Sequence, residues 1–497
     1  MERICLPLIF QDSMVLQRRK PVCIWGEAEE CASVRVTLGE DAAVAEVSDG
    51  KWKTYLPPRE AETGLTLTVS GGRFSISFTD VAVGEVWIAG GQSNMEYLLK
   101  HDADREEALL LEDPDIRCYE VPKISFPGQE AHYRMSDAGV WRKENRAESP
   151  YFTAVGFYFA NRLHETLRVP VGVINCTWGG TSASCWVSED YLAGDLQFYL
   201  DKAREVRSSI DPEETLEKYI ALQKNILSSN IDMGKPNLAP IRPLLDEAAH
   251  DRLMTMNNWP CSAFRPCGLF TFMLKTIVPY TVSGVIWYQG ESDEYFSEHY
   301  ESMMRAVVRC WRSNWREDLP FLMVQLASFE VMAEYLDFVP IRRAQAELAK
   351  KEPGVYLVTA MDTGMRYDIH PKRKKPVGVR LALQALDKVY HRHLPADSPT
   401  VLCAQWEQGS VVVRLKHCGS GLHIKGERPE TFDISADGEV VSDFTVSVRP
   451  HELVLTADAF LTAHTLRIAF CQRAYCELTI YSGADLPMLP FDLSLSR

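Results

Sequence analysis

The stretch Val86-Trp87-Ile88-Ala89-Gly90-Gly91-Gln92-Ser93-Asn94-Met95 decides the fold. Its first four residues are apolar and predict a short buried strand, and the two glycines let the backbone turn sharply where that strand ends. A serine after such a turn exposes its hydroxyl at the edge of a sheet, as a nucleophile requires. The same pattern is also typical of a serine that begins a helix as its N-cap, so this stretch alone does not identify an active site.

Strands and helices alternate after this stretch. Apolar runs predict strands, and helical spacing predicts helices, over the following ranges: strands at 169–176, 283–288, 321–326 and 355–360, and helices at 153–167, 268–278, 341–350 and 377–390. This alternation predicts an α/β fold with a parallel sheet covered on both faces, and functional groups at the carboxyl ends of its strands. Residues 196–229 are polar with helical spacing, which indicates an insertion.

The two ends of the chain carry short alternating runs that are typical of β structure. At the N-terminal end they lie at 22–25, 34–38, 52–56, 65–69 and 74–78, with turn residues between them. We therefore predict three domains. A β domain covers 1–83, an α/β domain covers 84–395 with a helical insertion around 190–265, and a second β domain covers 396–497.

Composition limits the partners and the compartment. The chain has 497 residues and a formal net charge of -15, which disfavours binding to nucleic acid and to anionic membranes. No run of ~18 apolar residues predicts a membrane span, and the first residues lack a secretory signal pattern, so we expect a cytoplasmic protein. The 13 cysteines are scattered, which predicts reduced, mostly buried thiols without a zinc site.

Three further segments follow predicted strands or precede a helix. The turn at Gly179-Gly180 can present a backbone N–H to an oxyanion, or can be an ordinary loop. Gln289 offers a neutral side-chain donor, and Glu291 beside it is a carboxylate that could equally begin the next helix. His370 follows Asp368, and histidine is the usual general base near neutral pH, although a lone histidine is more often structural.

Together these segments resemble the SGNH hydrolase superfamily, and within it the sialate O-acetylesterase group, which is related to carbohydrate esterase family six. The resemblance rests on four motifs in this order: Gly90-Gly91-Gln92-Ser93-Asn94-Met95-Glu96, Trp178-Gly179-Gly180-Thr181, Gly284 to Asp293 and Asp368-Ile369-His370-Pro371. It covers residues 84–392, and the flanking β regions are also similar. It implies an SGNH-type three-layer hydrolase domain, flanked by β-sandwich-like domains, that removes O-acetyl groups from sugars without a metal or organic cofactor.

The resemblance assigns roles to residues of this sequence. Ser93 corresponds to the nucleophile and His370 to the base, while Ser93 N–H, the Gly179-Gly180 turn and the Gln289 side chain correspond to the oxyanion hole. Two positions depart from the superfamily pattern. Gln289 stands where Asn is usual, and Tyr367 stands where an Asp three residues before the histidine is usual. The triad acid is therefore Asp368 or Glu291, and we place Asp368 first.

The substrate and the class of activity leave alternatives. The resemblance implies O-acetyl sialic acid as the partner, whereas acetylated xylan or xyloglucan is the alternative. A sialate carboxylate needs a cation in the pocket, for which Arg265, Arg366 and the run Lys372 to Lys375 are the candidates. A non-catalytic carbohydrate-binding protein and a metal-dependent deacetylase are the competing classes. The sequence does not predict an oligomeric state.

Overall fold

The central sheet is the largest element of the molecule. The computed structural model describes residues 4–29, 31–135, 138–228, 255–330, 337–426 and 431–497. The strand order is β10-β9-β11-β8-β12-β13-β14. The strands span β8 Phe74–Gly91, β9 Ile116–Glu120, β10 Trp141–Lys143, β11 Val171–Thr177, β12 Gly284–Tyr288, β13 Phe321–Gln325 and β14 Val355–Thr359. All neighbours pair in parallel except β10, which runs antiparallel at the edge. The predicted parallel sheet is confirmed.

Two pairs of helices pack beside this sheet. Helix α3 (Ala154–Leu167) contacts α10 (Lys375–Gln384), and α8 (Tyr300–Trp315) contacts α9 (Val339–Lys351). Thr153 caps α3 by accepting a hydrogen bond from Gly156 N–H, which explains why the helix begins where its apolar spacing does. The two short helices α1 (Ser93–Glu96) and α2 (Arg105–Ala108) follow β8.

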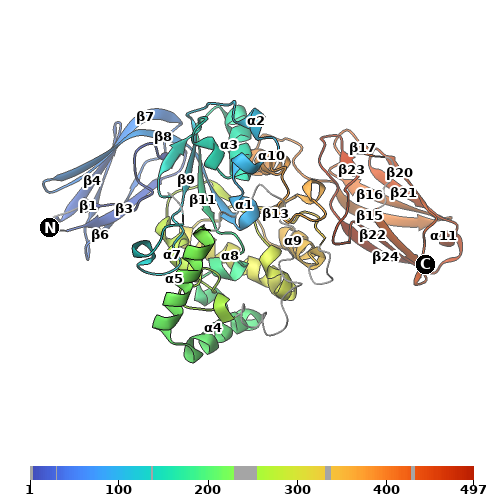
Figure 1. The fold of residues 1–497 in the computed structure, drawn as a ribbon. Coiled ribbons are helices and arrows are strands. Elements are labelled where there is room, and N and C mark those ends of the chain that lie inside the picture. Colours follow the sequence, from blue (N-terminus) through green and yellow to red (C-terminus); the bar gives the residue numbers. More distant parts are fainter. Residues whose placement is uncertain (1–3, 30, 136–137, 229–254, 331–336, 427–430) are drawn as a thin grey trace.

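The helical insertion projects from the central region (Figure 1). It contains α4 (Gln197–Ser209) and α5 (Pro212–Ser228), in agreement with the helical spacing at 196–229. The remainder of the predicted insertion up to 254 lies outside the described residues. The predicted helix at 268–278 is shorter than expected, because α7 ends at Phe272 and a 3-10 turn follows over Leu274–Thr276.

The N-terminal region is entirely β. Its strands are β1 Ile4–Cys5, β2 Val15–Gln17, β3 Val22–Ala28, β4 Ser33–Leu38, β5 Asp41–Glu46, β6 Lys51–Leu56 and β7 Glu62–Gly71. β8 pairs with β7 over its first half and enters the central sheet with its second half. This single strand therefore crosses the boundary that we predict at residue 83. One hydrophobic core also runs from Ile4 to Leu386 without a break between the two regions.

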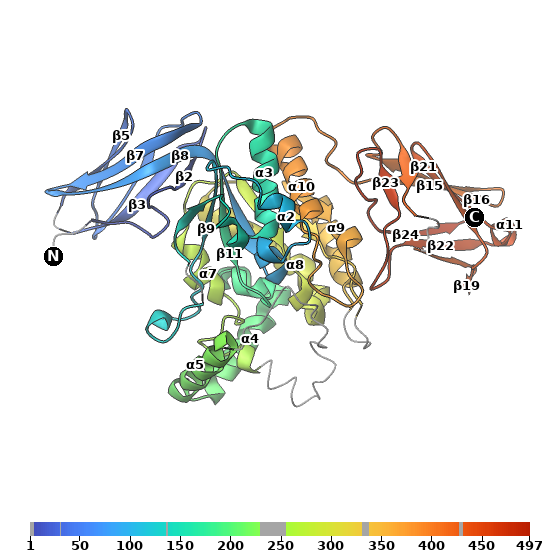
Figure 2. The ribbon, with the colours of Figure 1, turned by 45° about the horizontal axis from the view of Figure 1, so that its top comes forward.

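The C-terminal region has its own hydrophobic core, which includes Met361 of the central region. Its strands are β15 Thr400–Glu407, β16 Ser410–Lys416, β17 Leu422–Ile424, β18 Phe432–Ala436, β19 Glu439–Val440, β20 Thr445–Arg449, β21 Glu452–Thr456, β22 Thr465–Phe470, β23 Ile480–Ser482 and β24 Phe491–Ser496, with α11 at Ala459–Thr462. Figure 2 shows this region beside α9 and α10, at the opposite end of the molecule from the N-terminal strands. Within the described ranges, no helix is both long and apolar enough to cross a membrane.

Candidate active site

The turn that holds Ser93 requires both of its glycines. Gly91 has a φ of 129°, and a Cβ there would lie 2.1 Å from the carbonyl oxygen of Tyr288 on β12. A Cβ on Gly90 would lie 2.9 Å from the Trp287 ring. Because β12 approaches so closely, only glycine fits at either position. Ser93 is the first residue of α1, so its N–H has no partner within the helix.

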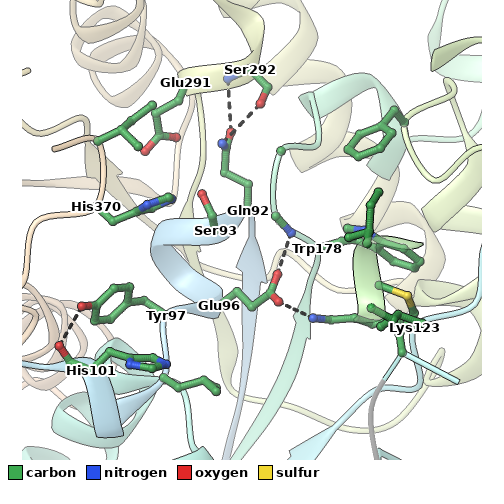
Figure 3. A pocket seen from close by; sticks show the side chains of 18 of the residues that line it. Gln92, Ser93, Glu96, Tyr97, His101, Lys123, Trp178, Glu291, Ser292 and His370 are labelled. Carbon is green, nitrogen blue, oxygen red and sulfur yellow. Dashed lines mark hydrogen bonds and ion pairs between the residues drawn. The ribbon is translucent and has the colours of Figure 1, made fainter. Parts of the chain in front are cut away.

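A cavity of about 670 Å³ opens at the carboxyl ends of β8, β11 and β12. Five of the predicted site residues line it: Ser93, Gly179, Gly180, Glu291 and His370. Its apolar wall consists of Tyr97, Met135, Trp178, Ile226, Leu227 and Phe264. Figure 3 shows the Ser93 side chain pointing toward the His370 ring inside this cavity. The sequence separation between these residues is large, and the parallel sheet is what brings them to one edge.

His370 is suited to accept a proton. The side chain is buried, and its ring stacks on Tyr97 with 6.5 Å between the ring centroids. Burial, followed by the positive charge of Lys374, lowers the pKa of His370 to about 4. The imidazole is therefore neutral at pH 7, which is the form that a general base needs.

Two carboxylates lie near His370, and each already has partners. Asp368 Oδ1 accepts a hydrogen bond from the backbone N–H of His370 at 2.9 Å, and its Oδ2 lies 3.0 Å from Lys372 Nζ. Glu291 Oε1 accepts from Asn94 Nδ2 at 2.5 Å, and burial raises the pKa of Glu291. Among the residues that the structure describes, no hydrogen bond joins either carboxylate to the imidazole.

The two glycines of the second motif are not equivalent. Gly179 N–H donates to Glu96 Oε2 at 2.6 Å, and the other carboxylate oxygen of Glu96 pairs with Lys123. Gly180 has a φ of 77° and is exposed to the cavity. In the described part of the chain, Gly180 N–H has no hydrogen-bond acceptor. Gly180 therefore has the free donor of this pair.

Gln289 does not reach the cavity. Its side chain is fully buried, and its Nε2 donates to Thr181 O at 3.2 Å and to the Asp293 carboxylate. The structure therefore places the predicted side-chain donor in a network behind the site. Its neighbour Gly290 contacts the nucleophile turn instead, since Gly290 N–H donates to Gln92 Oε1 at 3.3 Å.

Three residues that the sequence did not single out organise the nucleophile turn. Gln92 Oε1 accepts from the N–H groups of Gly290 and Ser292, each at 3.3 Å. Asn94 contacts Glu291, and Glu96 fixes Gly179. All three belong to the same motif as Ser93. Their position beside the nucleophile was the available signal, although it did not reveal their partners.

None of the predicted cation candidates lines the described wall of the cavity, and most of them have partners of their own. Arg265 donates to the carbonyl oxygens of Ser125 and Ser262, Arg366 pairs with Glu330, Lys372 pairs with Asp368, and Lys375 pairs with Glu107. Lys123 is the lysine that lines the cavity within the described ranges, and Glu96 neutralises it.

The cysteines form no disulfide among the residues that the structure describes. All 13 cysteines are free thiols, and ten of them are buried, in agreement with the prediction that most of the thiols are buried. Within the described residues, no group of three or more His, Cys, Asp or Glu side chains has the arrangement of a metal site.

Several known proteins are similar to this chain in sequence. Residues 269–387 match the family model described as carbohydrate esterase, sialic acid-specific acetylesterase. A sialate O-acetylesterase from Rattus norvegicus is 28% identical, with 97% of this chain and 93% of the relative covered. The Homo sapiens sialate O-acetylesterase is 26% identical over 78% of this chain and 72% of the relative.

A solved structure is similar over the whole length. A carbohydrate acetylesterase from Xanthomonas citri matches with a TM-score of 0.77 and 26% identity, and 99% of each chain is covered. The match therefore includes the N-terminal and C-terminal β regions as well as the central sheet. Along most of its length the chain is therefore similar to the sialate O-acetylesterase group of carbohydrate esterases.

Proposed function

We propose that this protein is a serine esterase that removes O-acetyl groups from carbohydrates by two-step acyl transfer. One observation carries the proposal: Ser93, a neutral His370 and the free N–H of Gly180 lie around a single cavity. His370 takes the proton of Ser93 Oγ, which attacks the acetyl carbonyl. The sugar hydroxyl leaves with the proton from His370, and water then attacks the acetyl-enzyme to release acetate.

The oxyanion hole consists of backbone donors in this proposal. The N–H groups of Ser93 and Gly180 face the developing negative charge, and each such donor contributes roughly 3 kcal/mol. Gly179 supports the hole indirectly, because its bond to Glu96 holds the turn that presents Gly180. Gln289 supports the end of β12 rather than the oxyanion.

Asp368 is the first candidate for the triad acid, and Glu291 is the second. Asp368 holds the backbone of His370 at 2.9 Å, and its negative charge raises the pKa of the imidazole against the effect of burial. Glu291 lines the cavity, and its Oε2 has no hydrogen bond among the described residues. Asp368→Asn and Glu291→Gln separate the two. The variant with the larger loss of turnover, at an unchanged unfolding temperature, identifies the acid.

The named relatives suggest an O-acetylated sialic acid as the substrate. A neutral acetylated hemicellulose sugar is the second candidate, and one observation favours it. The described wall of the cavity contains a single lysine, Lys123, which Glu96 already neutralises. A sialate carboxylate would have to compete with Glu96 for that ammonium, whereas the aromatic wall of Trp178 and Phe264 suits the apolar face of a neutral pyranose.

The proposal also covers the architecture. We assign an SGNH-type three-layer hydrolase domain to 84–395, with β-sandwich-like domains at 1–83 and 396–497 whose role is either support or sugar binding. A cytoplasmic location and the absence of nucleic acid and membrane partners stay predictions from composition.

An acetate-release screen tests the proposed function. Purified protein is assayed on O-acetylated sialosides and on acetylated xylan and xyloglucan oligosaccharides, with and without a chelator. Ser93→Ala and His370→Ala should each lower acetate release at least ~10³-fold, whereas Ser208→Ala and His464→Ala at exposed positions should not. A sugar that binds without acetate release would support a binding protein instead. Loss of activity in the chelator would favour a metal-dependent deacetylase.

A further inference from the structure

A lysine is fully buried directly behind the site. Lys374 precedes α10 and has 0% exposure. Its Nζ donates to Asn94 Oδ1 at 2.5 Å, and it lies 4.8 Å from the centroid of the Tyr97 ring and 5.5 Å from that of Tyr288. Burial of an ammonium group lowers the stability of the fold unless the group is hydrogen-bonded and compensated by charge. The burial of Lys374 therefore calls for a functional explanation.

The bond from Lys374 determines the orientation of the Asn94 amide. The ammonium form of lysine can only donate, so with Lys374 charged the oxygen of the amide faces Lys374 and its nitrogen faces the other side. On that side, Asn94 Nδ2 donates to Glu291 Oε1 at 2.5 Å and to Ile369 O at 3.0 Å. Asn94 follows Ser93 directly, and Ile369 directly precedes His370. One amide thus connects the nucleophile turn, the histidine loop and the end of β12.

The backbone of Lys374 is held as firmly as its side chain. Its N–H donates to Asp102 Oδ2 at 2.7 Å, and Asp102 Oδ1 accepts from Tyr158 OH at 2.8 Å on α3. Nearby, Ala103 N–H donates to Lys372 O at 2.8 Å. The backbone of Lys374 is therefore held in place, as the role of a positioning group requires.

We infer that Lys374 is a positioning residue of the esterase site, which fixes the Asn94 amide and thereby the placement of Ser93, His370 and Glu291 relative to one another. This inference rests on the proposed function. Lys374 itself does not line the cavity, so it acts through Asn94 and not on the substrate.

The charges around Lys374 support this role. Burial lowers the pKa of Lys374 to about 7, against the opposing effects of Glu291 and Asp102 and, more weakly, Asp368. Lys372 acts in the same direction as burial. In return, the charge of Lys374 lowers the pKa of His370, second only to burial. Removal of this cation should therefore raise the pKa of His370 as well as release Asn94.

Lys374→Met tests the inference, because methionine fills a similar volume without a charge or a donor. We expect kcat to fall roughly 10²-fold with a small change in KM, since the reacting groups are misplaced while the cavity is intact. The acid limb of the kcat/KM profile should move to higher pH. Lys374→Arg, which keeps the charge and the donor, should recover part of the loss. Lys375→Met is the matched control, since Lys375 pairs with Glu107 at the surface.

A double-mutant cycle provides the readout that a general loss of stability would not produce. If Lys374 acts through Asn94, the double variant Lys374→Met with Asn94→Ala should be no less active than the less active of the two single variants. Wild-type kcat and an unmoved acid limb in folded Lys374→Met would overturn the inference. If neither Lys374 variant folds, Asn94→Ala alone decides, and a kcat within about threefold of wild type rejects the role. An active Ser93→Ala variant would instead reject the proposed function itself.

Discussion

At the scale of single residues, the environment of His370 sets the pH range of the reaction. In the proposed mechanism the ring must be neutral to accept the Ser93 proton, and burial with the charge of Lys374 lowers its pKa to about 4. The protonated form, which cannot act as a base, therefore predominates only below that pH.

We expect kcat/KM for acetate release to be flat from neutral pH down to about 5 and to fall only as the pH approaches 4. The profile is measured between pH 3 and pH 8 at constant ionic strength. At the acid end, activity is measured again after return to neutral pH, to show that the protein has not unfolded irreversibly. An acid limb near the ordinary histidine value of about 6.5 would contradict this placement of His370.

Some site residues could be predicted from sequence, and others could not. Ser93 and His370 follow turns with recognisable chemistry, and both line the cavity. Our proposal of Gly180 rather than Gln289 as an oxyanion donor depends on the bonds that bury the Gln289 side chain and on the bond from Gly179 to Glu96. Such three-dimensional relations leave no periodic or compositional pattern in the sequence. Lys374 was seen only as part of a basic run, because its burial follows from the packing of α10.

At the scale of elements, the edge strand β10 ends beside a buried carboxyl group. Glu144 follows it with 2% exposure, and neither carboxylate oxygen has a hydrogen bond among the described residues. Burial, with a smaller effect from Asp113, raises the pKa of Glu144 to about 8. Between the usual glutamate pKa and this value, the folded chain keeps a proton that the unfolded chain releases. This group therefore reduces stability progressively as the pH rises through that range.

We expect Glu144→Gln to stabilise the protein at pH 8 by roughly 2 kcal/mol and to have little effect at pH 4.5, because glutamine never ionises. Urea unfolding of wild type and variant at both pH values measures the difference. Glu112→Gln, at an exposed position, is the control. An equal effect at the two pH values would contradict the buried, uncompensated state of Glu144.

Most central elements were predictable because their residues are either uniformly apolar or spaced as in a helix. The predicted helix at 153–167 begins one residue later as α3, and the predicted strand at 321–326 ends one residue earlier as β13. β9 and β10 were missed, since they are short and contain charged residues such as Arg117 and Arg142. α8 was also missed, although its buried residues recur at helical spacing.

At the scale of the whole molecule, the loop at Arg473–Tyr475 makes several of the contacts between the C-terminal region and the central region. Arg342 of α9 is buried and donates to the carbonyl oxygens of Arg473 and Ala474, and Phe329 N–H donates to Ala474 O at 3.1 Å. The Arg366 guanidinium lies 4.5 Å from the centroid of the Tyr475 ring. Because Arg366 is four residues before His370, this contact also supports the loop that carries His370.

We expect Arg342→Met to lower the free energy of unfolding by about 2 kcal/mol, since two charge-assisted hydrogen bonds to the carbonyl oxygens of Arg473 and Ala474 are lost. The neighbouring Arg343 contacts the same region from an exposed position, and Arg343→Met should cost at most about 0.5 kcal/mol. Calorimetric unfolding of both variants measures this. Equal effects of the two substitutions would show that the buried guanidinium does not hold the regions together.

The order of three regions along the chain was predictable from the change between strand and helix patterns. Their physical connection was not, because apolar alternation cannot show whether two predicted strands are one. The runs at 74–78 and 86–89 were separate predictions, and the structure joins them in β8.

The continuity of β8 has a consequence for protein engineering. β8 ends at Gly91, just before the nucleophile turn, and its first half is hydrogen-bonded to β7. The N-terminal and central regions also share one hydrophobic core. A cut at residue 83 would sever this strand and expose the apolar side chains of Val81 and Val83, which are now fully buried. The N-terminal region therefore cannot be replaced as an independent domain. A chimera with another β domain would need its junction elsewhere, or would have to inherit β7 and β8 as a unit.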